Sequence, residues 1–217
     1  MDNNLRYSRF SLFTFHFSLF SFHFILIVVI SLPDFFDGET EQIVRLFEAG
    51  LQILHLRKPG ATCEQTERLL QSLPTPYLRR IVIHDHFDLA LRYPLRGVHL
   101  NARNRVAPPG YRGLVSRSCH TLREVEQHKA DCAYVFLSPI FNSISKTGYG
   151  FAFSIDELRQ AAAQGIIDNK VIALGGISVE RIPLVRQIGF GGAALLGDIW
   201  QQPPEKQVEH FLIANNE

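Results

Sequence analysis

The chain has 217 residues, of which 46% are apolar and 20% are charged, and its net charge at pH 7 is +1. This length is typical of one domain with a full hydrophobic core and excludes two large domains. The apolar content excludes a disordered chain, and the balanced charge does not favour nucleic acid as a partner. Its three cysteines have no C-x-x-C spacing, so neither a disulfide framework nor a cysteine zinc site is indicated, and we expect a cytoplasmic protein.

The first 23 residues differ in composition from the rest of the chain. Seven of the 17 phenylalanines lie between Phe10 and Phe24, in two successive copies of a seven-residue pattern. Low complexity of this kind is not a core pattern. We therefore expect residues 1–23 to be an extension outside the fold and residues 24–217 to form the domain. Arg6 and Arg9 precede the apolar stretch, so a signal peptide or membrane anchor is the alternative, and contact with a membrane is expected only if this extension is genuine.

Short apolar runs alternate with helical patterns in the remainder of the chain. We expect eight buried strands, at Phe24–Ile30, Leu51–Leu56, Ile81–His84, Gly97–Leu100, Leu114–Ser118, Ala133–Leu137, Val171–Leu174 and Gly192–Leu196. Helices are expected to begin at the capping boxes that start at Thr62, Thr121 and Ser154. Glycines at 50, 165 and 189 stand where three helices should end.

This alternation predicts an α/β fold, a (β/α)8 barrel of the TIM type. Because eight strands must fit into about 194 residues, the third and fourth connections have to be short. The alternative is a doubly wound open sheet, but no Gly-x-Gly-x-x-Gly follows the first strand.

Polar side chains gather directly after the predicted strands. Five of the nine histidines fall in these segments, namely His55, His84, His86, His99 and His120. In a barrel of parallel strands, the loops at the C-terminal ends of the strands carry the chemistry. The sequence therefore predicts a polar site at that end of the barrel.

Two glycine turns indicate a phosphate site at the same end. Gly175 and Gly176 follow the seventh strand and precede a helix, and Gly197 follows the eighth. Amide groups at such a turn are unobstructed by side chains and suit a phosphate. The loops after the last two strands are the recurrent phosphate site of this architecture.

Cations on other loops suit a second anionic group. They are Arg57, Lys58, Arg103 and Lys146, and the hydroxyls of Ser143 and Ser145 lead toward Lys146. Solvated surface cations are the alternative reading, above all for Arg103. Asp85 could hold Mg²⁺ against a diphosphate, because hard oxygen ligands suit that ion.

These segments resemble the thiamine phosphate synthases and their thiazole tautomerase relatives, which are small (β/α)8 barrels. The synthases carry Gln-Leu-Arg-Glu-Lys, Asn-Asp-Arg, Gly-Val-His-Leu-Gly-Gln-x-Asp, Ser-x-His-Thr, Gly-Pro-Ile-Phe-x-Thr-x-Thr-Lys and Gly-Gly-Ile at successive strand ends. The corresponding segments here begin at His55, His84, Gly97, Ser118, Ser138 and Gly175. The six motifs occur in the same order, one to a strand, and the resemblance extends from about Phe24 to Trp200.

The resemblance implies a transferase of thiamine biosynthesis. It would join an aminopyrimidine methyl diphosphate to a thiazole phosphate, with release of pyrophosphate. Small molecules are thus the expected partners, and a homo-oligomer is possible. The residues that carry over are Arg57, His84 and Lys146 for the diphosphate, Asp85 for Mg²⁺, Ser118 for the pyrimidine, and Ser143, Ser145, Gly175, Gly176, Leu196 and Gly197 for the thiazole phosphate. Arg57, Ser118 and Lys146 are the expected catalytic residues.

Several positions depart from the synthase pattern. His55 and His84 replace a glutamine and an asparagine, Pro59 replaces a lysine, and Asn104 replaces a second magnesium-binding aspartate. These changes should weaken metal and diphosphate binding unless Lys58 and Arg103 compensate. The tautomerases have a histidine where this chain has Pro139, which favours the synthase reading.

Two further functions remain open from the sequence. His84 and His86, with His55, His99, His120 or Asp198, could bind Zn²⁺ in a barrel hydrolase. A thiazole tautomerase or a barrel that only binds thiamine precursors or phosphates is the other alternative.

Overall fold

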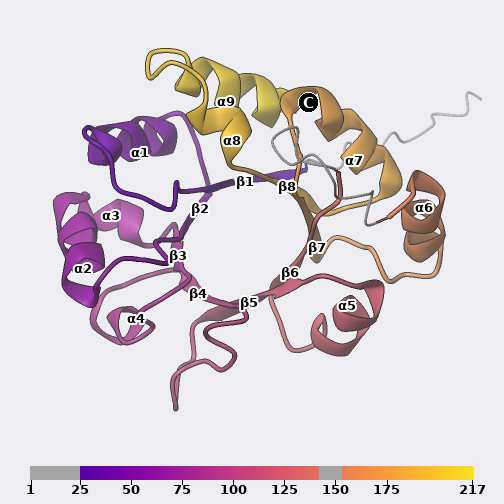
Figure 1. Ribbon diagram of the computed structural model, residues 1–217, viewed down its shortest axis with the longest axis horizontal. Helices are drawn as coiled ribbons and strands as arrows, with labels where there is room; N and C mark the ends of the chain where they lie inside the picture. The colour runs from indigo at the N-terminus through magenta and orange to yellow at the C-terminus, as the bar shows by residue number, and fades with distance from the viewer. Residues whose placement is uncertain (1–24, 142–152) are drawn as a thin grey trace, which may run out of the picture.

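The eight strands close into one parallel barrel, with the helices around its outside (Figure 1). The computed structural model describes residues 25–141 and 153–217. Each strand pairs with its neighbours in chain order, and β8 pairs with β1. The strands are β1 Leu26–Ile30, β2 Ile53–Leu56, β3 Ile81–Ile83, β4 Gly97–Leu100, β5 Leu114–Cys119, β6 Tyr134–Leu137, β7 Val171–Leu174 and β8 Gly192–Leu195. The barrel prediction is confirmed, and the open-sheet alternative is excluded.

Three helices begin at the capping boxes and three end at the glycines that the sequence predicts. They are α1 Glu39–Glu48, α2 Cys63–Ser72, α3 Thr75–Leu78, α4 Leu89–Arg92, α5 Leu122–His128, α6 Ile155–Ala163, α7 Ile182–Ile188, α8 Gly197–Trp200 and α9 Gln207–Asn216, with a 3₁₀ turn, η1, at Val179–Arg181. Reciprocal capping boxes are formed at Thr62, Thr121 and Ser154, at the starts of α2, α5 and α6. Each such cap stabilises its helix by about 1 kcal/mol. Gly189 ends α7 in the left-handed conformation, at φ 109°.

The third and fourth connections are short, as the length of the chain requires. Only the four-residue helix α4 lies between β3 and β4, and residues 101–113, between β4 and β5, contain no helix. Residues 101–113 therefore form a loop that crosses from the C-terminal end of β4 to the start of β5. This loop carries Arg103 and Asn104 at its beginning and Arg112 at its far end.

Two apolar clusters hold the barrel together. The larger lies between the strands and the surrounding helices, and the smaller lies inside the ring. The inner cluster includes Val28 and Ile30 of β1, Ile172 of β7 and Ala194 of β8. Burying a side chain of this size stabilises the fold by about 1.5–3 kcal/mol. The strands β2 to β6 contribute several polar side chains to the same interior, and these form the floor of the candidate site.

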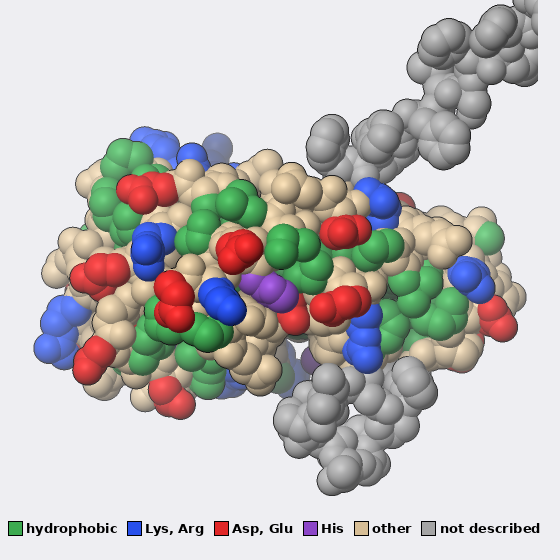
Figure 2. All heavy atoms as spheres, turned by 90° about the horizontal axis from the view of Figure 1, so that it is seen from above, with side chains coloured by type: hydrophobic (Ala, Val, Ile, Leu, Met, Phe, Trp, Pro, Cys, Tyr) green, Lys and Arg blue, Asp and Glu red, His purple; other side chains and the backbone are tan. Residues whose placement is uncertain are grey.

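The outer surface has charges of both signs. Figure 2, which views the molecule from the side of α1 and α9, shows acidic and basic side chains interspersed among apolar ones. Within the described ranges, no helix has the length and hydrophobicity needed to span a bilayer. The predicted extension at residues 1–23 lies outside the described residues.

Candidate active site at the C-terminal end of the barrel

Three histidines from adjacent strands meet in the barrel interior. His55 lies on β2, His84 directly follows β3, and His99 lies on β4; all three are buried. Nδ1 of His55 is 2.8 Å from Nε2 of His84, and the rings of His84 and His99 stack with their centroids 4.2 Å apart. His84 and His99 lie side by side because they follow the paired residues Ile83 and Val98. His55 pairs with Val82, two residues before His84, and faces the same interior because side chains alternate along each strand.

Hydroxyl groups of β5 and β6 complete this cluster. Nε2 of His99 is 2.8 Å from Oγ of Ser118, and its Nδ1 is 2.8 Å from Oγ of Ser116. Nε2 of His55 is 2.6 Å from the hydroxyl of Tyr134. Every hydrogen-bonding nitrogen of His55 and His99 therefore has a partner, which removes most of the cost of burying these polar groups.

We assign the tautomers of the rings from their hydrogen-bond partners. Ser116 donates to the carbonyl oxygen of Val98, so it accepts from Nδ1–H of His99, and Nε2 of His99 accepts from Ser118. Tyr134 lies 2.6 Å from Nε2 of His55 and is also a hydrogen-bond neighbour of Ser116, and we assign its proton to the shorter contact, with His55. His55 then donates from Nδ1 to Nε2 of His84. This assignment leaves His84 with an N–H donor at Nδ1 and leaves the lone pairs of Ser118 as acceptors.

The three imidazoles are uncharged at neutral pH. Burial holds the pKa of His55 well below its ordinary value. Charge repulsion from His99 and Arg96 lowers this pKa further. Burial also lowers the pKa of His84, with smaller effects from the other two histidines, Arg57 and Arg103. Burial and the nearby Arg117 lower the pKa of His99 to about 3.

Arg57 and Lys58, which follow β2, have different surroundings. The hydroxyl of Ser31, at the end of β1, accepts from the backbone N–H of Arg57 at 2.9 Å and donates to its carbonyl oxygen at 3.2 Å. The Arg57 side chain is half-buried and close enough to His84 to lower its pKa. Lys58 is buried, and its Nζ lies 2.6 Å from a carboxylate oxygen of Glu39 and 2.8 Å from the carbonyl oxygen of Asp34. Lys58 therefore contributes to the packing of α1 rather than lying open at the barrel end.

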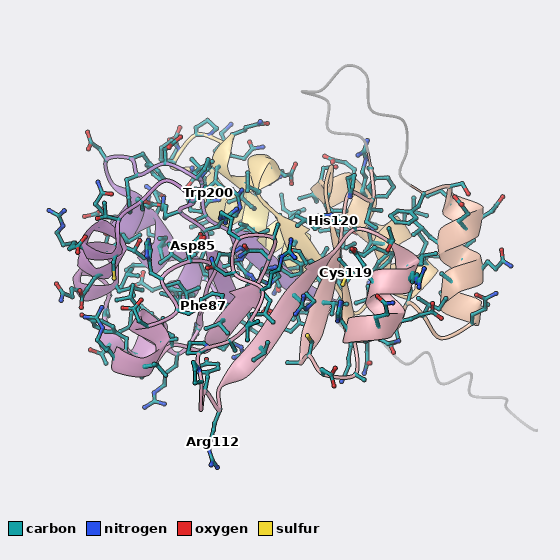
Figure 3. All side chains as sticks on the ribbon, turned by 60° about the horizontal axis from the view of Figure 1, so that its bottom comes forward. Asp85, Phe87, Arg112, Cys119, His120 and Trp200 are labelled. Carbon is teal, nitrogen blue, oxygen red and sulfur yellow. The ribbon has the colours of Figure 1, made fainter. Side chains whose placement is uncertain are left out.

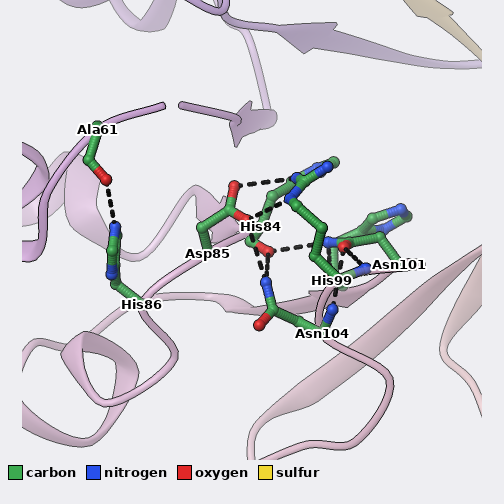
Figure 4. Close-up of polar contacts among 8 residues, drawn as sticks. Ala61, His84, Asp85, His86, His99, Asn101 and Asn104 are labelled. Atoms are coloured by element: carbon green, nitrogen blue, oxygen red, sulfur yellow. Dashed lines mark hydrogen bonds and ion pairs between the residues drawn. The ribbon is translucent and has the colours of Figure 1, made fainter. Parts of the chain in front are cut away.

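Asp85 is bound by two residues of the loop that follows β4 (Figure 4). Its Oδ1 and Oδ2 accept from Nε and Nη2 of Arg103, at 3.0 and 3.2 Å, and Oδ1 also accepts from Nδ2 of Asn104 at 3.0 Å. Because both carboxylate oxygens face a guanidinium and Asn104 directs its amide nitrogen toward them, these residues do not fit a Mg²⁺ ion, which requires oxygen ligands. The magnesium set expected from Asp85 and Asn104 is not formed by the described residues.

The glycine turn after β7 contacts the chain that follows β6. Gly175 and Gly176 have φ angles of 96° and 62°, which favour glycine, and a Cβ at Gly175 would lie 2.8 Å from Cα of Pro139. Oδ2 of Asp198 accepts from the backbone N–H of Val179 at 3.2 Å and lies 2.8 Å from Nε2 of His210. Asp198 therefore joins the turns after β7 and β8. In the turn after β8, Leu196 is the N-cap residue of α8 and Gly197 is the first residue of that helix.

The expected pairing of His84 with His86 does not occur. The backbone of His86 turns to a φ of 54°, and its Nε2 lies 2.8 Å from the carbonyl oxygen of Ala61, outside the ring. His120 contacts the carbonyl oxygen of Ser138, and Figure 3 shows it beside Cys119 at the end of β5.

His55, His84 and His99 do each offer a nitrogen within 4.8 Å of the others, a spacing that a metal ion could use. Two of these nitrogens are hydrogen-bonded to each other, however, and the charges nearest the rings are arginines. A zinc hydrolase is therefore not favoured.

Some predicted residues lie outside the described part of the chain, and others were not predicted. Ser143, Ser145 and Lys146 fall within residues 142–152, which the structure does not describe. Tyr134, Ser116 and Asn101 belong to the hydrogen-bonded network, although the sequence analysis did not select them. The period-two alternation of β5 and β6 is the signal that could have found the first two, because it places them on the same interior face as Ser118 and Phe136.

Comparisons with known proteins agree with this architecture. The sequence profile of the thiamine monophosphate synthase family matches residues 26–199. The thiamine-phosphate synthase of Serratia proteamaculans is 31% identical over 172 residues, covering 75% of this chain and 81% of that protein. The crystal structure of thiamine phosphate pyrophosphorylase from Bacteroides thetaiotaomicron has a TM-score of 0.81 and 43% identity, and the match covers 88% of this chain and 96% of that one.

A more distant structure shares the fold. Thiamine phosphate pyrophosphorylase from Pyrococcus furiosus is 18% identical, with a TM-score of 0.69 over 89% of this chain and 97% of that chain. The sequence profile covers all eight strands, and the Serratia relative exceeds 30% identity over most of both chains. The chain belongs to the thiamine monophosphate synthase family.

Proposed function

We propose that this chain joins an aminopyrimidine methyl diphosphate to a thiazole phosphate and releases pyrophosphate. In this reaction the C–O bond between the pyrimidine methylene and the diphosphate breaks, and its electron pair leaves with pyrophosphate. The lone pair of the thiazole nitrogen then forms the new C–N bond. The observation that carries the proposal is the match of the family profile to residues 26–199, a span that contains Arg57, His84, Ser118 and the glycine turn.

The leaving diphosphate would be bound on the side of β2 to β4. Arg57 and Lys146 are the proposed cations, and the N–H at Nδ1 of His84 is a neutral donor beside Arg57. A pre-oriented donor at the point where negative charge develops is typically worth about 10²–10³ in rate. No step is assigned to a metal ion, although the family is generally magnesium-dependent, because Asp85 and Asn104 do not form an oxygen-ligand set.

The pyrimidine would lie over the histidine floor. Ser118 donates its proton to His99, so its oxygen can accept from the exocyclic amino group of the ring. His55 takes the interior position that a glutamine has in the synthase pattern, but it is fully engaged by Tyr134 and His84. We therefore assign His55 to the support of His84 rather than to direct contact with substrate. Lys58 is similarly assigned to the support of α1.

The thiazole phosphate would be bound by the turns after β7 and β8. Gly175, Gly176, Leu196 and Gly197 would supply backbone amides, and Ser143 and Ser145 would supply hydroxyls. Asp198 supports this site by holding the two turns together. The protein thus acts by holding the two heterocycles in line for the reaction and by stabilising the leaving group. The three cysteines are unpaired, in keeping with the proposed cytoplasmic location.

The coupling assay tests this function. Purified full chain is incubated with both heterocycles, and thiamine phosphate and pyrophosphate are quantified, with either substrate omitted as a control. Equal amounts of the two products are expected. If both substrates bind by calorimetry but no product forms at high enzyme concentration, the chain is a binding barrel and the proposal fails.

A further inference from the structure

We propose that the guanidinium of Arg103, oriented by Asp85, takes the place of a divalent metal ion, so that this chain binds a diphosphate without magnesium. The inference deepens the proposed function, because it concerns the leaving group of that reaction. Asp85 is then a positioning residue for Arg103, and Arg103 is a diphosphate-binding residue. The argument depends on four observations at the C-terminal ends of β3 and β4.

The first observation is the geometry of the ion pair. Nε and Nη2 of Arg103 lie 3.0 and 3.2 Å from the two oxygens of Asp85, which is the two-pronged arrangement of a guanidinium on a carboxylate. A cation therefore already occupies the side of Asp85 that a metal would use. A Mg²⁺ ion there would have to displace Arg103 or lie within a few ångströms of its charge, which is repulsive.

The second observation is the orientation of Asn104. Its Nδ2 donates to two acceptors, Oδ1 of Asp85 and the carbonyl oxygen of His84, each at 3.0 Å. A rotated amide group would place its oxygen against both of these oxygens, so the nitrogen must face them. Asn104 therefore acts as a donor that supports Asp85, and its amide oxygen is turned away from the position of a metal.

The third observation is that the loop is held in place. Oδ1 of Asn101 accepts from the backbone N–H groups of Arg103 and Asn104, at 3.0 and 3.2 Å. Nδ2 of Asn101 donates to the carbonyl oxygens of His84 and His99, at 2.9 and 3.1 Å. This turn fixes the start of the loop to both strands, as Figure 4 shows. The backbone of Arg103 is thus held by this turn, and its exposed guanidinium is oriented by Asp85.

The fourth observation is what remains available on Arg103. Two of its five N–H groups are used by Asp85, and its side chain is 43% exposed, whereas that of Asp85 is 13% exposed. Arg57 follows Leu56, whose carbonyl oxygen accepts from the backbone N–H of His84 at 3.1 Å, and Arg103 is bound to Asp85, the residue after His84. Both arginines therefore lie beside His84, in keeping with their lowering of its pKa. The outer edge of the guanidinium, Arg57 and the Nδ1–H of His84 are therefore three donors for one anion.

The charges of the two arrangements are equivalent. A Mg²⁺ ion is balanced by two carboxylates, whereas one guanidinium is balanced by the single carboxylate of Asp85. The replacement of a second carboxylate by the neutral Asn104 is consistent with the loss of one positive charge. Arg103 would bind phosphate oxygens directly through its planar array of donors.

Calorimetry with inorganic pyrophosphate tests the proposal. We expect pyrophosphate to bind the unmodified chain in EDTA, and added Mg²⁺, which forms a complex with pyrophosphate in solution, should not tighten this binding. Arg103→Ala should weaken binding in EDTA by at least about tenfold, in line with the loss of a charged donor. Arg112→Ala is the matched control, because Figure 3 shows Arg112 at the tip of the loop, pointing away from the ring; it should bind like the unmodified chain. Thermal unfolding verifies that both variants are folded.

Two results would overturn the inference. One is pyrophosphate binding by the unmodified chain that requires Mg²⁺, and the other is an Arg103→Ala variant that binds as tightly as the Arg112→Ala control. A second measurement uses Mn²⁺ as a paramagnetic probe. We expect no stoichiometric Mn²⁺ binding by the unmodified chain in the absence of pyrophosphate, and a saturable site at one Mn²⁺ per chain under these conditions would also overturn the inference.

These outcomes are distinguishable from failure of the proposed function. If thiamine phosphate forms only when Mg²⁺ is present, the function stands and this inference fails. If pyrophosphate binds in EDTA through Arg103 but the two heterocycles are not coupled, the inference stands and the function fails.

Discussion

The barrel interior has a polar half and an apolar half, although the strands of both are buried. Strands β2 to β6 contribute three histidines, two serines and Tyr134 beside apolar residues such as Ile53, Val82 and Phe136. Strands β7, β8 and β1 contribute apolar residues such as Ile172, Ala194 and Val28. The apolar half stabilises the fold by burial. The polar half gains little from burial, because its hydrogen bonds replace those with water. This difference indicates that the polar half is present for binding and the apolar half for stability.

The largest expected effect is on activity and lies at the edge of the polar half. Arg57→Ala should reduce turnover by about 10²–10³, because its charge would meet the charge that develops on the leaving diphosphate. The free energy of unfolding should change little. Steady-state kinetics and thermal unfolding check both statements, with Arg112→Ala as the control. Turnover within threefold of the unmodified chain would remove Arg57 from the proposed mechanism.

The next effect is the response of the polar half to acid. The folded pKa values of His55, His84 and His99 lie below the unfolded value of about 6.5, so below that pH the unfolded chain binds more protons than the folded one. Stability is therefore complete above pH 6.5 and falls as the pH is lowered, and for His99 this continues to about pH 3. The slope should be roughly 1 kcal/mol per pH unit for each histidine.

Urea unfolding between pH 7.5 and 5 measures this slope. His84→Asn removes one of the three histidines and should reduce the slope by the contribution of that histidine. A free energy of unfolding that is constant over this range would contradict the assignment of three neutral rings.

A substitution in the apolar half should lower stability and leave turnover nearly unchanged, the opposite of what we expect for Arg57→Ala. Ile172→Ala removes a buried side chain of β7 and should lower the free energy of unfolding by about 2–5 kcal/mol. Turnover at a temperature where the variant is folded should remain within about threefold of the original. Chemical denaturation and the coupling assay provide the two values. A large loss of turnover without loss of stability would mean that Ile172 of β7 acts in catalysis or substrate binding, and it would contradict the distinction between the two halves.

The smallest expected effect tests the support of the histidines. Tyr134→Phe removes the donor to Nε2 of His55 and should lower the free energy of unfolding by about 1–3 kcal/mol, the cost of a buried polar atom without a partner. Because the tautomer of His55 is then free to change, we expect weaker pyrophosphate binding as well. Phe136→Leu is a useful comparison on the same interior face of β6. Equal stability of Tyr134→Phe and the original chain would mean that the His55 ring is not held by Tyr134.

The sequence predicted the fold in detail because its signals are local. Strand positions followed from short apolar runs, and the starts of α2, α5 and α6 followed from capping boxes that form as expected. The direction of individual side chains was harder to predict. His84 and His86 were expected to share a face, but a positive φ at His86 turns its side chain toward Ala61.

The partners of charged residues also could not be predicted from the sequence. Lys58 appeared as a candidate for the anion site, yet Glu39, which is 19 positions away, holds it in the packing of α1. Asp85 appeared as a metal ligand, and Arg103 occupies its oxygens instead. Contacts of this kind depend on the tertiary structure, whereas the alternation of strands and helices is set by neighbouring residues.

The most direct test of the central claim, that a neutral polar half faces the leaving group, is nuclear magnetic resonance of the histidine rings. Protein labelled with ¹⁵N at histidine is recorded at pH 6 and titrated with inorganic pyrophosphate, and His84→Asn identifies the His84 signals. The account predicts that the rings of His55, His84 and His99 are neutral and that the Nδ1–H signal of His84 shifts on binding. Protonated rings at pH 6, or His84 signals that do not move when pyrophosphate binds, would contradict it.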